Sequence, residues 1–148
     1  YLLKKRAKFL PSAPYGPSLI GVFTFAGDLG LKWKHNANIS WTNDDWGVSL
    51  SQIFRKGYTN QKLPGIANGT VVRPDFNEKV GNYIIYNFAV TAKAWEKMKV
   101  TLGVKNIFDT DPPFAVTYDS NTGAGSSWEP RVADPRGRSF TLAAEVKF

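Results

Sequence analysis

A strict two-residue alternation of apolar and polar side chains runs through several segments of about ten residues and limits what this chain can fold into. In residues 31–42 the odd positions are apolar except for His35, and the even positions are all polar. Because successive side chains of a strand point to opposite faces, each such segment predicts a strand with one apolar and one polar face. The further segments with this pattern are 46–55, 83–94, 98–108 and 139–148. We also expect residues 1–9 to be the end of a sixth strand.

The connections between these segments alternate between very short and very long. Residues 43–45 and 95–97 are expected to be tight turns, whereas residues 10–30, 56–82 and 109–137 carry all of the prolines and most of the glycines. Structureless connections longer than about 12 to 15 residues are uncommon in compact soluble domains. The alternation predicts that all three long connections lie at the same end of the sheet.

Alternating strands fit two architectures, a soluble β-sandwich and a transmembrane barrel whose apolar face meets lipid. Strand length favours the barrel, because soluble strands are typically about five or six residues long and bilayer-spanning strands about 9 to 11. Short turns at one end and long loops at the other are typical of outer-membrane barrels. Aromatic residues also gather toward the strand ends, where they would meet the bilayer interfaces. The expected interface aromatics are Trp33, Trp41, Trp46, Phe54, Trp95 and Phe108.

Five or six strands are too few to close a barrel, since the smallest bacterial barrels have about eight. An open edge in hydrocarbon would leave backbone groups unpaired at several kcal/mol each. The sequence opens with Tyr1 and shows neither a secretory signal nor the continuous apolar run of a membrane helix. We therefore expect residues 1–148 to be part of a larger barrel in the bacterial outer membrane.

Several motifs resemble those of TonB-dependent outer-membrane receptors. The stretch VTLGVKNIFD at 100–109, followed by TDPPF at 110–114, resembles the penultimate strand and following loop of that family, where G-V-x-N-L-F-D-x-x-P is characteristic. The stretch PRGRSF at 135–140 resembles the beginning of the family's last strand, and residues 41–46 and 55–58 resemble a hairpin two strands earlier.

The resemblance implies an all-β fold, an antiparallel up-and-down transmembrane barrel of about twenty-two strands, of which this chain would hold the C-terminal strands, about six of them. It also implies an N-terminal plug domain and a TonB box, neither of which is present in these residues. Such receptors import scarce nutrients of the siderophore, cobalamin or oligosaccharide class with energy supplied through TonB. The implied partners are outer-membrane lipid and lipopolysaccharide, TonB, the plug domain and the barrel-assembly machinery, and no cofactor is expected.

The C-terminal run of alternating apolar residues resembles the signal by which the barrel-assembly machinery recognises its clients. A lipid-facing strand would show the same alternation, and the two interpretations are compatible. The residues of this assembly signal are Phe140, Leu142, Ala144, Val146 and Phe148.

Substrate contacts are expected in the three long connections, because recognition concentrates in loops on a rigid scaffold. The candidates are Trp128, Arg131, Arg136 and Arg138. For the arginines of the PRGR stretch, the alternative to substrate contact is a structural role, since they recur in the family motif. The polar strand faces carry Lys32, Lys34, Arg55, Lys93, Lys99, Lys105, Glu145 and Lys147. These charges could steer an anionic substrate or meet acidic plug residues, but we favour a solvated lumen wall.

Composition argues against other functions. The net charge is +7, but no aromatic row interleaves with the basic residues as nucleic-acid binding would need. One histidine without cysteine cannot build a histidine-rich zinc site, and the role of His35 stays open. Ser126 and Ser127 lack a nucleophile elbow, so we expect no enzyme.

The main alternative to the barrel is a soluble β-sandwich that binds carbohydrate. In such a module Trp33, Trp41 and Trp128 would serve as stacking rings for sugars. The two architectures differ in what covers the apolar strand face, which is a second sheet in the module and lipid in the barrel.

Overall fold

The computed structural model describes residues 2–8, 10–23, 29–60, 64–72, 78–115, 117–118 and 125–148. The chain divides into two compact units, each of which is described by itself. The sheet unit consists of His35–Phe54, Ile84–Pro112 and Asp134–Phe148. The loop unit consists of Tyr1–Lys34, Arg55–Tyr83 and Pro113–Ala133.

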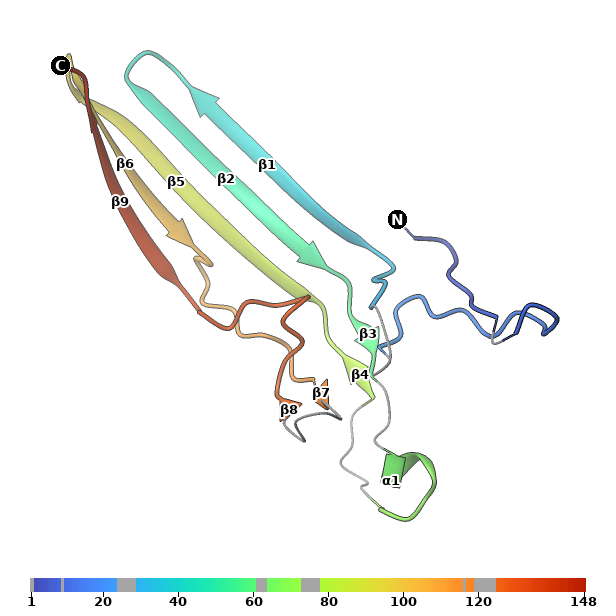
Figure 1. Ribbon diagram of the computed structural model, residues 1–148. Helices are drawn as coiled ribbons and strands as arrows, with labels where there is room; N and C mark the ends of the chain where they lie inside the picture. The colour runs from blue at the N-terminus through green and yellow to red at the C-terminus, as the bar shows by residue number, and fades with distance from the viewer. Residues whose placement is uncertain are drawn as a thin grey trace. The chain divides into compact units, whose positions relative to one another are not determined.

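Five long antiparallel strands form one open sheet, and they lie side by side in the order in which they occur in the chain (Figure 1). The strands are β1 (Lys34–Thr42), β2 (Trp46–Arg55), β5 (Tyr83–Trp95), β6 (Met98–Lys105) and β9 (Ser139–Val146). This up-and-down order confirms the predicted all-β antiparallel architecture, with each of the five long strands inside its predicted segment or within one residue of it.

Two predicted strand boundaries are wrong for identifiable reasons. The strand expected to reach residue 108 ends at Lys105, because Asn106 and Asp109 have φ angles of 52° and 54° in the left-handed region. The strand expected over residues 1–9 is absent from the described part, 2–8. The backbone of that part bonds instead to an irregular segment, with Leu19 N–H donating to the Lys5 carbonyl at 2.8 Å.

The register places the predicted apolar residues of neighbouring strands directly opposite one another. Leu102 of β6 pairs with Val90 of β5 on one side and with Leu142 of β9 on the other. In the same way, Val104 pairs with Phe88 and with Phe140. A shift of one residue would turn these side chains to the opposite face, so the apolar pattern fixes the register.

The opposite face of the same strands is polar. The hydroxyls of Thr91 and Thr101 lie 2.9 Å apart across β5 and β6. Lys99 pairs in register with Lys93 on β5 and with Glu145 on β9. The single acidic residue in this row therefore stands beside one of the two lysines, which offsets part of their mutual repulsion.

The apolar face of the sheet is open. Ile39, Leu102 and Leu142 are 76%, 43% and 74% exposed. In a β-sandwich these side chains would be buried against a second sheet. Within the described residues of the sheet unit there is no second layer, so the arrangement is that of a barrel wall.

The short turns occur where they were expected. In the first, the Asn43 side-chain oxygen accepts hydrogen bonds from the N–H groups of Asp45 and Trp46 at 3.0 and 2.6 Å. This asparagine-based turn, residues 43–45, is the whole connection between β1 and β2. At the second turn β5 extends to Trp95, where the register shifts by a bulge before β6 begins.

The loop unit contains short elements that the alternation did not predict. These are β3 (Tyr58–Thr59) paired with β4 (Lys79–Val80), helix α1 (Pro64–Ala67), and β7 (Thr117–Tyr118) paired with β8 (Gly125–Ser126). Its buried apolar residues are Phe23, Tyr58, Val80, Tyr83, Ala115, Val132 and Ala133. Among the residues that the structure describes, no helix has both the length and the apolar composition to cross a membrane.

Candidate functional site

Two cavities in the loop unit share one lysine. The first has a volume of about 480 Å³, and its lining includes the beginning of β1, the end of β2 and a segment around residue 131. The second has a volume of about 400 Å³, and its lining includes β3 and β4. Lys32 lines both of them.

The lining of both cavities is strongly basic. The cations are Lys32, Lys34, Arg55 and Arg131 in the first cavity and Lys32, Lys56 and Lys79 in the second. No acidic residue is among the described lining residues of either cavity. We call these six cationic residues the basic surface. Like charges gathered around a concave region create a field that attracts anions.

Strand pairing brings two of these cations to the same end of neighbouring strands. Lys34 is the first residue of β1 and Arg55 is the last residue of β2, which runs antiparallel to it. The pairing continues past Arg55, since the Lys56 N–H donates to the Trp33 carbonyl at 3.0 Å. The backbone therefore holds several positive charges close together.

Arg131 is fixed by a buried acid. Its Nε lies 2.6 Å and its second terminal nitrogen 3.2 Å from the two carboxylate oxygens of Glu129, which is 5% exposed. The guanidinium also stands over the ring of Phe23, 5.4 Å from its centre. Glu129 offsets part of the Arg131 charge while the side chain remains about half exposed.

Tyr58 forms a buried part of the second cavity wall. Its ring lies 6.5 Å from that of Phe23. Burial raises the pKa of the Tyr58 phenol well above its ordinary value, the nearby Glu129 raises it further, and Arg131 lowers it in part. The phenol is therefore neutral at neutral pH and adds no negative charge to the basic lining.

Gly57 also lines the second cavity, where only glycine fits. A Cβ atom there would lie 2.3 Å from the Val80 carbonyl oxygen and 2.9 Å from the carbonyl carbon of Gly81. The Gly57 N–H donates to the Asn82 side-chain oxygen at 2.8 Å. This close approach is the structural reason for glycine in the stretch at 55–58.

The predicted contact residues are divided between the two units. Arg131 lines the first cavity, and Trp128 is half-buried in the loop unit. Arg136 and Arg138 belong to the sheet unit, where Arg136 pairs with Asp134 before β9 and Arg138 pairs with Asp109 after β6. Their geometry favours the structural alternative, whereas the ligand role of all four remains a prediction.

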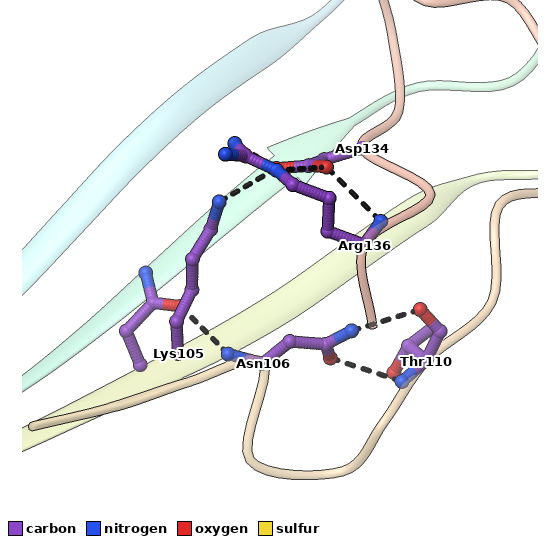
Figure 2. A network of polar contacts seen from close by, with 6 residues as sticks. Lys105, Asn106, Thr110, Asp134 and Arg136 are labelled. Atoms are coloured by element: carbon purple, nitrogen blue, oxygen red, sulfur yellow. Dashed lines mark hydrogen bonds and ion pairs between the residues drawn. The ribbon is translucent and has the colours of Figure 1, made fainter. Parts of the chain in front are cut away.

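Asp134 is the centre of a charged cluster at the end of β6 (Figure 2). Its carboxylate accepts from Arg136 Nε at 2.9 Å and from Lys105 Nζ at 2.6 Å. Hydrogen bonds from the Arg136 side chain, and next from Lys105, hold the pKa of Asp134 well below its usual range. This cluster connects the last residue of β6 to the segment that leads into β9.

Asn106 makes a second connection beside that cluster (Figure 2). It is 2% exposed, and its side-chain amide bonds to both backbone groups of Thr110. Its N–H donates to the Asn87 side chain of β5 at 3.0 Å. The Asn106 side chain thus provides hydrogen-bond partners for backbone groups just after the strand pairing of β6 ends.

The two segments that carry the strongest family resemblance also contact each other. The Arg138 N–H donates to the Asp109 carboxylate at 2.6 Å, and its guanidinium lies 3.7 Å from the same group. Gly137, which directly precedes Arg138, has a φ of 66°. Asp109 and Arg138 therefore join the two ends of the last long connection.

His35 has hydrogen-bonding partners on the apolar face. Its Nε2 lies 2.9 Å from the Gln52 side-chain oxygen, and the Gln52 amide donates to the Tyr86 hydroxyl at 2.6 Å. The His35 ring stacks on Phe54 with centres 5.1 Å apart, and Phe108 meets Tyr86 edge-on. His35 therefore belongs to a row of polar side chains across β1, β2 and β5, and its hydrogen bond to Gln52 accounts for a histidine on the apolar face.

Most of the predicted interface and assembly residues are exposed. Among the interface aromatics, Trp33, Trp41, Trp46, Trp95 and Phe108 are exposed, and Phe54 is half-buried. Phe140, Leu142, Ala144, Val146 and Phe148 are exposed at the edge strand β9 and just beyond it. Their contacts with lipid and with the assembly machinery remain predictions.

The described residues contain no group of three or more histidines, cysteines or acids that could hold a metal ion. Comparison with known proteins adds a structural relationship. No protein-family model matches the chain, and no curated protein matches it. A point mutant of the ferric enterobactin receptor from Pseudomonas aeruginosa superposes with a TM-score of 0.51 at 19% identity. The match covers 76% of this chain and 16% of that receptor, and it supports the barrel-type fold.

Proposed function

We propose that this chain forms C-terminal strands and extracellular loops of a TonB-dependent receptor in the bacterial outer membrane. In this proposal the receptor actively imports a scarce nutrient of the siderophore, cobalamin or oligosaccharide class. Residues 1–148 supply part of the barrel wall, and the plug domain and TonB box come from the rest of the receptor.

The observation that carries this proposal is the open apolar face of the five-stranded sheet. Phe140, Leu142 and Ile39 on it are more than 70% exposed. Burying a side chain of this size is worth about 1.5 to 3 kcal/mol, so a face of such residues needs an apolar partner. Acyl chains of a bilayer meet that need without a second sheet.

The fold relationship supports the same conclusion. A solved structure that resembles the chain is a ferric enterobactin receptor, and the matched region is a minor part of its length. The five strands follow one another along the sheet as they do in an up-and-down barrel. We therefore favour transport over catalysis as the activity.

The proposal is tested by expressing the intact receptor in a bacterium that lacks its own nutrient receptors, with and without TonB. We expect the receptor in the outer-membrane fraction. We also expect TonB-dependent uptake of one radiolabelled cargo among a ferric siderophore, cobalamin and an oligosaccharide. Recovery in the soluble fraction, or uptake that is the same without TonB, would contradict the proposal.

A second measurement separates the receptor from the carbohydrate-binding module. Residues 1–148 expressed alone without detergent should aggregate, because β1 and β9 leave unpaired edges and the apolar face is open. A soluble, monodisperse product that binds sugars would favour the module instead.

A further inference from the structure

We propose that Asn68 is a site of spontaneous covalent modification, at which the side-chain amide is converted into a carboxylate. Asn68 stands directly before Gly69, and together they form the only asparagine–glycine pair in the sequence. Both residues are exposed in the turn that follows α1. The proposal concerns the chemistry of this turn and does not depend on the proposed transport function.

The reaction joins two groups of adjacent residues and consumes only water. The backbone nitrogen of Gly69 loses its proton to water or hydroxide and bonds to the side-chain carbonyl carbon of Asn68. This step closes a five-membered imide ring and releases the side-chain nitrogen as ammonia, and it is favoured because it is intramolecular. Water then adds to one of the two ring carbonyls and reopens the ring. The product at position 68 is aspartate, or isoaspartate when the backbone continues through the former side chain.

The first argument is the accessibility of the Gly69 nitrogen. Glycine has no side chain to crowd the approach, and apart from its chain neighbours no atom of the described residues lies within 4 Å of where a Cβ would be. The Gly69 N–H donates to the Ile66 carbonyl at 3.3 Å, which is longer than the usual range of about 2.7 to 3.2 Å. The proton that must leave is therefore weakly held in an exposed residue.

The second argument is that two donors hold the Asn68 amide oxygen. This oxygen accepts from the Thr70 N–H at 3.0 Å and from the Thr70 hydroxyl at 2.7 Å. The Gly65 carbonyl, at 3.2 Å, is the more distant acceptor of the same hydroxyl. When the Gly69 nitrogen bonds to the side-chain carbon, the amide oxygen takes on negative charge, and donors at about 2.7 to 3.1 Å stabilise such an oxyanion. Thr70 therefore assists the reaction.

The modification changes the connection between β3 and β4. A carboxylate at position 68 adds a negative charge to an exposed segment, and the two Thr70 donors can bind it in place of the amide oxygen. The isoaspartate product instead lengthens the backbone by a methylene group, close to the Val71 N–H that donates to the Gly65 carbonyl at 2.9 Å. Modified copies of the protein therefore differ from fresh ones in charge and in backbone at one position of the loop unit.

The test incubates the intact protein in detergent at pH 6 and at pH 8, beside a synthetic peptide of residues 64–72 as the reference. Mass spectrometry of proteolytic fragments detects the conversion of amide to acid, and chromatography separates aspartate from isoaspartate. We expect position 68 to react before every other asparagine, and roughly tenfold or more faster at pH 8, because loss of the Gly69 proton is promoted by base. An Asn68 amide that persists in the protein while the peptide is converted would overturn the proposal.

The part played by the turn is tested with Thr70→Val, and Thr70→Ser is the matched control. Valine keeps the shape of threonine without its hydroxyl, whereas serine keeps the hydroxyl. Loss of one hydrogen bond to the oxyanion should slow the reaction of the folded protein about two- to tenfold in Thr70→Val, and Thr70→Ser should react at the original rate. In the corresponding peptides, which lack the folded turn, the three rates should agree. A folded Thr70→Val protein that reacts as fast as the unmodified one, or faster, would overturn the assistance by Thr70.

Discussion

Asn106 and Thr110 form a reciprocal pair of hydrogen bonds at the end of β6. The Asn106 side-chain nitrogen donates to the Thr110 carbonyl at 3.0 Å, and its side-chain oxygen accepts from the Thr110 N–H at 2.9 Å. Because Asn106 is buried, water cannot easily replace these bonds. The pair stabilises the turn with which the last long connection begins.

Asn106→Ala should therefore destabilise the intact protein. It leaves the backbone groups of Thr110 without their partner, at a cost of about 1 to 3 kcal/mol. The measurement is the urea midpoint of unfolding. Thr110→Ala is the matched control, because Thr110 takes part through its backbone only, and its midpoint should hardly change. Equal shifts in the two variants would contradict this account.

Gly57→Ala should distort the second cavity. The new methyl group would collide with the Val80 carbonyl oxygen, a backbone atom that cannot rotate away. Overpacking of this kind typically costs about 1 to 3 kcal/mol. Thermal unfolding should show the loss, whereas Gly81→Ala, whose methyl group would lie 3.8 Å from Pro113, should be tolerated. If Gly57→Ala leaves the thermal unfolding temperature unchanged, β3 and β4 must be able to move apart to admit the methyl group.

Acid should weaken the cluster around Asp134. Hydrogen bonds from Arg136 and Lys105 lower the pKa of this carboxyl in the folded state. Its stabilisation is therefore complete above the ordinary aspartate pKa of about 3.9 and is lost as the pH falls below that value. Asp134→Asn should lower the free energy of unfolding at pH 7 and have progressively less effect below about pH 4.

The control for this pH dependence is Asp111→Asn, which removes an exposed aspartate of the same unit. No described residue forms an ion pair with Asp111. Urea unfolding of this variant should follow that of the unmodified protein at both pH values. A stability difference between Asp134→Asn and the unmodified protein that is the same at pH 3 and pH 7 would exclude the ion pairs as its cause.

Removal of Phe148 should reduce assembly of the protein. The C-terminal run resembles an assembly signal, and Phe148 is fully exposed beyond β9. We expect less heat-modifiable barrel in the outer membrane with unchanged synthesis. Phe148→Trp, which keeps an aromatic ring, should assemble better than the deletion. Unaltered barrel yield after the deletion would rule out this role for the terminal residue.

The sequence predicted the long strands well because each has its own periodic signal. Once Leu102 and Leu142 are known to share a face, antiparallel pairing of strands of similar length leaves few possible registers. The expected strand at residues 1–9 failed because that segment has no comparable alternation. Its described backbone bonds to irregular segments, with the Lys5 carbonyl accepting from the Leu19 N–H and the Leu2 N–H donating to the Lys32 carbonyl, and β1 remains the edge of the sheet.

The contacts of the loop unit could not be predicted in the same way. Strands of two residues, such as β3 and β4, are too short to show a period. The first cavity brings Lys32 and Arg131 together from distant parts of the sequence, and no local pattern encodes such a meeting. The motif residues Asp109 and Arg138 were recognised separately, but their ion pair became visible only in the structure.

The strands of the sheet are neighbours in the chain as well as in space. Each long connection, such as the one between β2 and β5, therefore joins two adjacent strands. Replacing such a connection by another sequence would not alter how any strand is paired. A wall built in this way can keep its framework while evolution varies the connections one at a time. Chains with the same sheet can in this way differ in their connections alone.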